Sequence, residues 1–265
     1  MSKRFLIKSE ALKGSRAVLE GSEAHHLLRV MRLKQGEPVV LFDGKGTLYE
    51  GVIERTSQEK VWISIQSLTK GSPSPLKILL LCAVPRHGKM DTIVEKLTEL
   101  GVDGIGAVLT ERTVPRWDAS QKKARLSRWE RIGREASKQS GGNRLPRILG
   151  VLSFQEAVEL RENPSLGVLL SPRAESSLTE ILPTPLTGEL FLLVGPEGGW
   201  SEREEAMATD AGWRPATLWD RTLKVDTACI AAVSIVQSKV ACLGRLGASA
   251  PFAPKSATRR PDATP

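Results

Sequence analysis

A glycine-rich stretch at residues 195–199, Gly-Pro-Glu-Gly-Gly, joins an apolar run typical of a buried strand to a helix that Ser201 is expected to cap. Ligands of parallel α/β sheets bind at the carboxyl ends of strands, and glycines there let the backbone approach a ligand closely. Glu197 adds a carboxylate that suits a cationic ligand. A tight turn that needs glycines for steric reasons explains the stretch equally well, and both interpretations stay open.

Residues 218–228, Leu-Trp-Asp-Arg-Thr-Leu-Lys-Val-Asp-Thr-Ala, form a second stretch between an expected strand and an expected helix. Asp226 or Thr227 can cap that helix by accepting a backbone hydrogen bond. Capping accounts for these two residues but not for Arg221 and Lys224, which place two cations beside an apolar element. These cations are therefore candidates for binding an anionic group.

A third stretch, residues 138–146, is a glycine loop at the end of a basic segment. Gly141 or Gly142 can end the preceding helix in the left-handed conformation. Capping explains the glycines and leaves a role in RNA binding open for Asn143 and Arg144.

The chain lacks three common signatures of active sites: the phosphate loop GxxxxGK[ST], the dinucleotide pattern GxGxxG and the nucleophile pattern GxSxG. Its three histidines and three cysteines have no spacing typical of a metal site, so no metal is expected. His25 lies on an expected helix and is interpreted as a packing residue or an RNA contact.

The positive charge of the chain is concentrated in one segment. The formal net charge is +8, and residues 112–147 alone hold 11 lysines and arginines against three acidic residues. The remainder is neutral, with 27 residues of each sign. Concentrated positive charge is typical of a nucleic-acid partner, because neutralising phosphates releases counterions. A solvated helix face rich in arginine is the alternative.

Length and composition indicate what kind of protein contains these stretches. The 265 residues, 40% hydrophobic and 26% charged, indicate a globular chain with one large or two ordinary domains. No apolar run approaches the ~18 residues of a membrane span, and the start of the chain has no secretory pattern. An odd number of cysteines without a CxxC pair fits a reducing cytoplasm.

The first 70 residues are expected to form a small β-barrel domain. The expected strands are residues 5–7, 17–19, 37–42, 48–54 and 61–66, and residues 43–46 give a hairpin signal. Residues 22–32 are expected to be helical, with Ser22 as the N-cap. Residues 69–75 have the composition of a linker.

From residue 76 the pattern changes to alternating strands and helices, which predicts a mainly parallel sheet covered by helices. The expected strands are residues 77–84, 105–109, 168–170, 190–194 and 216–218. The expected helices are residues 91–100 (capped by Asp91), 120–140, 202–211 and 227–243. Residues 76–245 form this domain, and residues 246–265 are expected to be a disordered tail.

The long helix at residues 120–140 explains part of the charge pattern. At 100° per residue an apolar stripe falls on one side, formed by Leu126, Trp129, Ile132 and Ala136. The opposite side is a basic face, formed by Lys123, Arg131, Arg134 and Lys138.

Taken in order, these motifs resemble the 16S ribosomal RNA uridine-N3 methyltransferase family of the SPOUT (trefoil-knot) superfamily. The resemblance spans nearly the whole chain and rests on residues 25–32, 43–44, 89–91, 96–102, 111–112, 139–141, 195–199 and 221–228. It implies a PUA-like barrel, a knotted α/β domain that binds S-adenosylmethionine (SAM), and a homodimer. The implied reaction methylates N3 of one uridine in the decoding region of the small ribosomal subunit.

The resemblance also implies functional residues by position. The SAM-binding residues would be Leu170, Ser171, Val194, Gly195, Pro196, Glu197, Gly198, Gly199, Leu218, Leu223, Thr227 and Ala228. The RNA contacts would come from the shared motifs and the basic segment, and are His25, Arg29, Arg32, Lys96, Arg112, Arg131, Arg134, Lys138, Asn143 and Arg144.

Some positions depart from the family pattern. Lys138 and Gly142 stand where the family usually has Glu and Arg around Gln-Ser-Gly, and Trp219-Asp220 precede Arg221 where a glycine is usual. Lys224 and Asp226 replace Arg and Glu, which keeps the charge but shortens the reach and loses the bidentate arginine fork.

Methyl transfer to N3 requires the uracil to lose a proton. Asp226 or Glu99 are candidates for the base, and Arg221, Lys224 or Arg144 for stabilising the anion. Helix capping is the alternative role of Asp226. The alternative functions are a ribose 2′-O-methyltransferase of the same fold and a non-catalytic RNA-binding or ribosome-assembly protein. A phosphate-binding enzyme is disfavoured, because Glu197 would repel phosphate.

Overall fold

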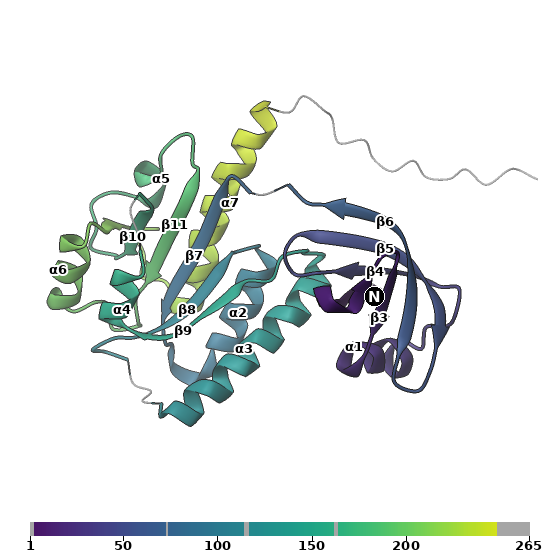
Figure 1. Cartoon of the computed structure of the whole chain (residues 1–265). Coiled ribbons are helices and arrows are strands. Elements are labelled where there is room, and N and C mark those ends of the chain that lie inside the picture. Colours follow the sequence, from purple (N-terminus) through teal and green to yellow (C-terminus); the bar gives the residue numbers. More distant parts are fainter. Residues whose placement is uncertain (1–2, 73, 114–116, 162–163, 248–265) are drawn as a thin grey trace, which may run out of the picture.

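Two β-sheets, each with its own hydrophobic core, make up the computed structural model of the protein (Figure 1). The structure describes residues 3–72, 74–113, 117–161 and 164–247. The tail expected at residues 246–265 lies almost entirely outside these ranges. None of the helices among the described residues has the length and hydropathy needed to cross a bilayer.

The N-terminal sheet contains six strands in the order β1-β4-β5-β6-β3-β2. Only the pair β1 and β4 is parallel, and the other pairs are antiparallel. The strands enclose a cluster that includes Phe5, Leu27 and Ile63. Their bounds are β1 Arg4–Leu6, β2 Leu12–Lys13, β3 Arg16–Leu19, β4 Pro38–Phe42, β5 Thr47–Thr56 and β6 Val61–Lys70, with a 3-10 turn η1 at Ser9–Ala11.

The helix expected at residues 22–32 is shorter and irregular. It consists of α1 (Gly21–His25) followed by a π-helical segment, η2 (His26–Val30). Ser22 as N-cap is wrong: the cap position is Glu20, without a side-chain cap bond. The segment widens so that Leu27 reaches the core of the barrel while Arg29 stays exposed.

The C-terminal sheet is fully parallel, with the order β12-β10-β11-β7-β8-β9. The strands are β7 Leu76–Ala83, β8 Gly104–Leu109, β9 Arg147–Ser153, β10 Leu166–Leu170, β11 Gly188–Val194 and β12 Arg214–Ala216. Strand β12 ends at Ala216, two residues before the expected end, and residues 217–218 join the loop that follows.

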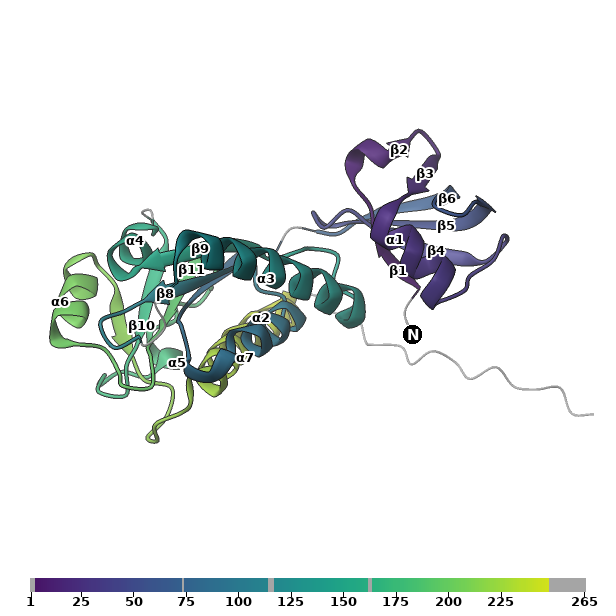
Figure 2. The same ribbon diagram turned by 90° about the horizontal axis from the view of Figure 1, so that it is seen from below.

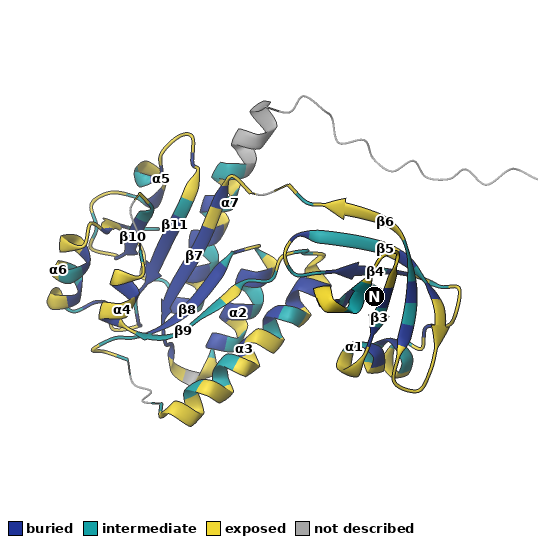
Figure 3. Ribbon diagram, in the orientation of Figure 1, coloured by how far each residue is buried: buried dark blue, intermediate teal, exposed yellow. Residues whose placement is uncertain are grey.

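Helices cover both faces of this sheet (Figure 2). One face packs against α2 (Met90–Glu99), α3 (Ala119–Ser140), α5 (Leu178–Ile181) and α7 (Val225–Gly247). The other packs against α4 (Phe154–Glu159) and α6 (Glu202–Asp210), and the turn η3 (Arg86–Gly88) follows β7. Successive side chains of β7 point to opposite faces of the sheet. Its continuous apolar run therefore contributes to the hydrophobic cluster on each face, and Figure 3 shows the strand as buried.

Three helices begin at a serine capping box, which explains why they form where they do. Ser153, Ser177 and Ser201 each accept a hydrogen bond from the backbone of a glutamate three residues on, which in turn binds the cap's N–H. Capping by Ser201 is thus confirmed. Capping of α2 by Asp91 is wrong, because Asp91 instead accepts hydrogen bonds from Arg128 and Trp129 of α3.

The third glycine loop, residues 141–146, joins the two halves of the molecule. The Asn143 amide donates to the Gly46 carbonyl at 3.0 Å, and the Gly46 N–H donates back to the Asn143 carbonyl at 3.0 Å. Leu145 N–H donates to the Gly44 carbonyl at 2.9 Å, and the Arg4 guanidinium donates to the Gly142 carbonyl at 2.8 Å. The hairpin turn of the barrel is therefore held against the end of α3.

Candidate functional site

A cavity opens at the carboxyl edge of the parallel sheet, where the loops after β10, β11 and β12 meet. It encloses about 620 Å³ including its open mouth. Ten of the twelve residues expected to bind SAM line it: Leu170, Ser171, Val194, Gly195, Pro196, Glu197, Gly199, Leu218, Leu223 and Ala228. Gly198 and Thr227 do not. Tertiary structure thus brings together stretches separated by up to 58 residues of sequence.

The loop after β11 owes its shape to its glycines. Gly199 has φ +72°, in the left-handed region that favours glycine, and its N–H donates to the Pro196 carbonyl at 2.9 Å. A Cβ on Gly195 would lie 3.0 Å from the ring of Trp200. The turn therefore requires glycine for steric reasons, and the same glycines also line the cavity with their backbone.

Trp200 ties two of the three loops together. Its indole N–H donates to the Leu170 carbonyl at 2.9 Å, and its ring is buried. Ser171 donates its hydroxyl proton to Glu205 at 3.0 Å, which fixes the loop after β10 against α6. These contacts hold the cavity wall in place before any ligand arrives.

Glu197 is exposed at the mouth and accepts a hydrogen bond from the Arg86 backbone at 3.2 Å. Arg112 donates to the Gly198 carbonyl, so this residue belongs to the rim of the same loop. Arg112 is expected to be an RNA contact, and the structure shows it beside the cavity rather than on α3.

The loop after β12 carries two basic residues whose side chains have no ion pair among the described residues. Arg221 and Lys224 are exposed, and neither forms an ion pair with any described residue. Arg221 lines the cavity and Lys224 lies just outside it. Two unpaired cations at a cavity mouth can bind and stabilise an anion.

Asp226 lies in the first turn of α7 and pairs with Lys89 from the start of α2. The Lys89 ammonium is 3.0 Å from one carboxylate oxygen and 2.9 Å from the other. This hydrogen bond holds the pKa of Asp226 below its usual range. Asp226 is thus a carboxylate at neutral pH, and Lys89 is a residue that sequence reasoning missed. Glu99, the other candidate base, pairs with Lys96 at 2.9 Å and does not line the cavity.

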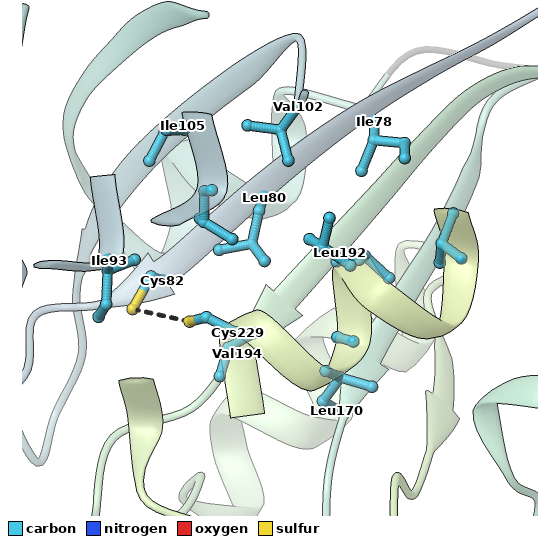
Figure 4. Packing of buried hydrophobic residues seen from close by; sticks show 14 of the residues in the cluster. Ile78, Leu80, Cys82, Ile93, Val102, Ile105, Leu170, Leu192, Val194 and Cys229 are labelled. Atoms are coloured by element: carbon cyan, nitrogen blue, oxygen red, sulfur yellow. Dashed lines mark hydrogen bonds between the residues drawn. The ribbon is translucent and has the colours of Figure 1, made fainter. Parts of the chain in front are cut away.

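Two buried thiols pack the start of α7 against β7 (Figure 4). The Sγ atoms of Cys82 on β7 and Cys229 on α7 are 3.6 Å apart, surrounded by Leu80, Ile93 and Val194. Burial raises the pKa of the Cys229 thiol well above its ordinary value, so it packs as a neutral apolar group.

The expected exposure of Lys138 is wrong. Its side chain is buried, and its ammonium lies 2.5 Å from Glu23 of the barrel and 3.1 Å from Glu135. The helical wheel could not show this, because the barrel packs against that side of α3. Asn143 is likewise engaged, by the Gly46 carbonyl, and Arg144 lies against Gly46.

Other basic candidates remain accessible. Exposed side chains are those of His25, Arg29, Arg32, Arg131 and Arg144, while Arg134 is half-buried at a groove between α3 and the barrel. Lys96 is partly exposed but pairs with Glu95 and Glu99. Among the described residues, no three His, Cys, Asp or Glu side chains come together as a metal site would require.

The cavity fits the cofactor implied by the sequence. Its inner wall is apolar, with Leu170, Leu218, Leu223 and Val225, which suits a flat aromatic base. Its backbone turns offer peptide groups close to the ligand, and Glu197 offers a carboxylate to a cationic group at the mouth.

Comparison with known proteins agrees with this fit. A family model described as an RNA methyltransferase domain matches residues 72–237, and one described as an RNA methyltransferase PUA domain matches residues 19–66. The chain is similar to ribosomal RNA small subunit methyltransferase E of Mycobacterium tuberculosis, with 32% identity covering 84% of this chain and 86% of the relative. The Synechocystis protein of the same name is 29% identical, covering 90% and 78%.

A solved structure gives the same result in three dimensions. Ribosomal RNA small subunit methyltransferase E from Neisseria gonorrhoeae, bound to S-adenosylmethionine, superposes with a TM-score of 0.81 and 31% identity, covering 90% of this chain and 98% of that one. The N-terminal sheet is PUA-like, in accord with the fold expected from the sequence. The chain therefore belongs to the ribosomal RNA small subunit methyltransferase E family of RNA methyltransferases.

Proposed function

We propose that this protein transfers the methyl group of SAM to N3 of a uridine in the decoding region of 16S rRNA. Its class is that of its family: it is a SAM-dependent rRNA methyltransferase. The target atom is the proposed part. The observation that carries it is the pair of exposed cations, Arg221 lining the cofactor cavity and Lys224 just outside it, which have no ion pair among the described residues.

SAM would be held by the ten cavity residues named above, with the apolar wall around its adenine. When bound it supplies an electrophilic methyl group on a sulfonium. The protein then contributes alignment, because an in-line displacement needs the acceptor held behind the methyl. The network of Trp200, Ser171 and Glu205 keeps the cavity wall rigid for this purpose.

Uracil N3 carries a proton at neutral pH, and its removal places negative charge on the neighbouring carbonyl oxygens. Arg221 and Lys224 would stabilise that charge, since both are exposed cations of the loop that lines the cavity. Asp226 is available as a proton acceptor, although its hydrogen bonds to Lys89 lower its pKa and weaken it as a base. The cations therefore carry the greater part of the proposed activation.

The protein would act as a cytoplasmic homodimer, as the family resemblance implies. The exposed arginines of α3 and of the barrel would bind rRNA phosphates around the target, leaving the cavity free for the base. The deep knot implied for residues 76–245 belongs to the same proposal.

The test uses small ribosomal subunits from a strain that lacks the endogenous enzyme. The subunits are incubated with the purified protein and methyl-labelled SAM, and the labelled nucleoside is identified by mass spectrometry after digestion. Label in 3-methyluridine supports the proposal. Label in a ribose-methylated nucleoside would replace N3 by a 2′-oxygen as the target, and binding without label would indicate a non-catalytic protein.

A further inference from the structure

Trp219 is the one aromatic side chain that the protein exposes extensively among its described residues. Its relative exposure is 63%, and the other large apolar side chains with high exposure are all aliphatic: Val30, Leu68 and Leu160. The remaining tryptophans are buried or half-buried. An exposed indole beside a cavity is a candidate for ligand contact, because aromatic rings contribute most to binding energy when a partner buries them.

The ring stands at the mouth of the cofactor cavity, which it lines together with Arg221. The backbone of Trp219 is held by a side chain two residues earlier: the Thr217 hydroxyl donates to the Trp219 carbonyl at 2.9 Å. Thr217 itself is fixed, because its N–H donates to the Ser176 carbonyl at 2.9 Å and its carbonyl accepts from Leu178 at 2.8 Å. These hydrogen bonds fix the backbone of the loop next to Trp219.

The surroundings of the ring match a nucleotide. Exposed Arg221 and Lys224 follow within five residues and have no acidic partner among the described residues, so an anionic ligand can use them. An aromatic face beside free cations is the combination by which proteins bind single-stranded nucleic acid. The same cavity has aliphatic lining side chains, Leu170, Leu223 and Val225, that suit the cofactor, so the exposed ring of Trp219 is available to a second ligand.

We propose that Trp219 is the stacking platform for the target uracil once the base has left the RNA stack. This inference rests on the proposed N3 chemistry, because N3 lies on the pairing edge and is reachable only in an unpaired base. Extruding a base from its stack costs free energy, and stacking on an aromatic ring offsets part of that cost. Trp219 thereby lowers the energy of the extruded state and aligns the ring for transfer.

The test compares Trp219→Ala, Trp219→Phe and the matched control Leu160→Ala. Leu160 is also an exposed apolar residue of the same domain, but it does not line the cavity. We expect Trp219→Ala to lower kcat/KM for unmethylated small subunits about 10- to 100-fold, and Trp219→Phe to recover most of it. Leu160→Ala should stay within about twofold of the wild type, because it removes no contact with a ligand.

Three further measurements separate this role from others. The Kd for SAM, measured by calorimetry without RNA, should be the same for Trp219→Ala and the wild type, as should the sedimentation coefficient. A weaker Kd for SAM would place the ring on the cofactor's adenine, and a changed sedimentation coefficient would place it between two copies of the chain; either result overturns the inference. So does unchanged kcat/KM. If the wild type itself forms no 3-methyluridine, the proposed function fails and this inference with it.

Discussion

Residues 138–146, the end of α3 with the loop after it, and residues 217–228, the loop that leads into α7, both contain lysine and arginine, yet the fold uses them in opposite ways. In the first, Lys138 is buried against Glu23, and Asn143 is hydrogen-bonded to the barrel hairpin. In the second, Arg221 and Lys224 are exposed at a cavity and unpaired among the described residues. A basic residue near a loop therefore indicates a ligand only where the fold supplies no counter-charge.

The first loop thus works as a joint and the second as a binding surface. In the joint, polar groups of both sheets satisfy one another, so a change there should appear in stability. In the binding surface, the same groups await a partner, so a change should appear in affinity or rate. The following predictions test this division.

The largest effect is expected at the joint. Lys138→Ala leaves Glu23 without its partner at a largely buried position and should lower the free energy of unfolding by about 2–4 kcal/mol. Urea unfolding followed by circular dichroism measures it. Lys123→Ala, exposed on the same helix, is the control and should change stability by less than about 0.5 kcal/mol. Equal free energies of unfolding for the two variants would show that the Lys138–Glu23 ion pair does not stabilise the protein.

A charge at the binding surface should show the opposite behaviour. Lys224→Ala is expected to lower kcat/KM for small subunits about 10- to 100-fold, since it removes a charge-assisted contact to the developing anion. Its free energy of unfolding and its Kd for SAM should match the wild type, because the side chain is exposed and does not line the cavity. Lys224→Arg should restore most of the rate. A fall in stability of the size expected for Lys138→Ala would contradict the comparison.

The arginines on the basic face of α3, exposed Arg131 and half-buried Arg134, lie between these two cases. Arg131→Glu with Arg134→Glu should weaken binding to small subunits about tenfold at low salt and reduce the slope of log affinity against log salt by about two. The Kd for SAM should not change. The control is Arg203→Glu, exposed on α6 on the opposite side of the sheet. If the affinities of the double variant and the wild type agree at low salt, this surface is merely solvated.

The smallest effect concerns pH. Lys89 holds the pKa of Asp226 below its usual range, so the pair stabilises the fold above the unfolded pKa. That contribution is lost as pH falls through the lower folded value, below about pH 4. We expect Lys89→Met to be less stable than the wild type at pH 6 by under about 1 kcal/mol, since the pair is partly exposed. The difference should shrink towards pH 3; a difference independent of pH would show that Lys89 acts by packing alone.

Much of the fold could be predicted from local pattern. The apolar runs of β7 and β11 and the hairpin at Asp43-Gly44 appear where the sequence places them. Strand β9 and helices α4 and α5 were missed, although Ser153 and Ser177 each begin a capping box with a glutamate three residues on. That signal was present in the sequence. The widened turn at residues 26–30 was not, because packing of Leu27 decides it.

The candidate site divides in the same way. Its glycine turns and its residues were visible in the sequence, because local backbone geometry demands glycine at Gly199 and because parallel strands end at a common edge. The support supplied by Trp200 and the ion pair from Lys89 were not visible, since they join segments 30 and 137 residues apart.

The sequence by itself determined most of the strands and helices, that the later sheet is parallel, and where positive charge accumulates, because these follow from periodicity and composition over short windows. Only the tertiary structure decided which charges are free. Lys138 and Lys224 have the same side chain, but Glu23 of the barrel packs against Lys138, whereas Lys224 is exposed. A charge acquires its function from what surrounds it in space, and that depends on contacts between residues distant in sequence.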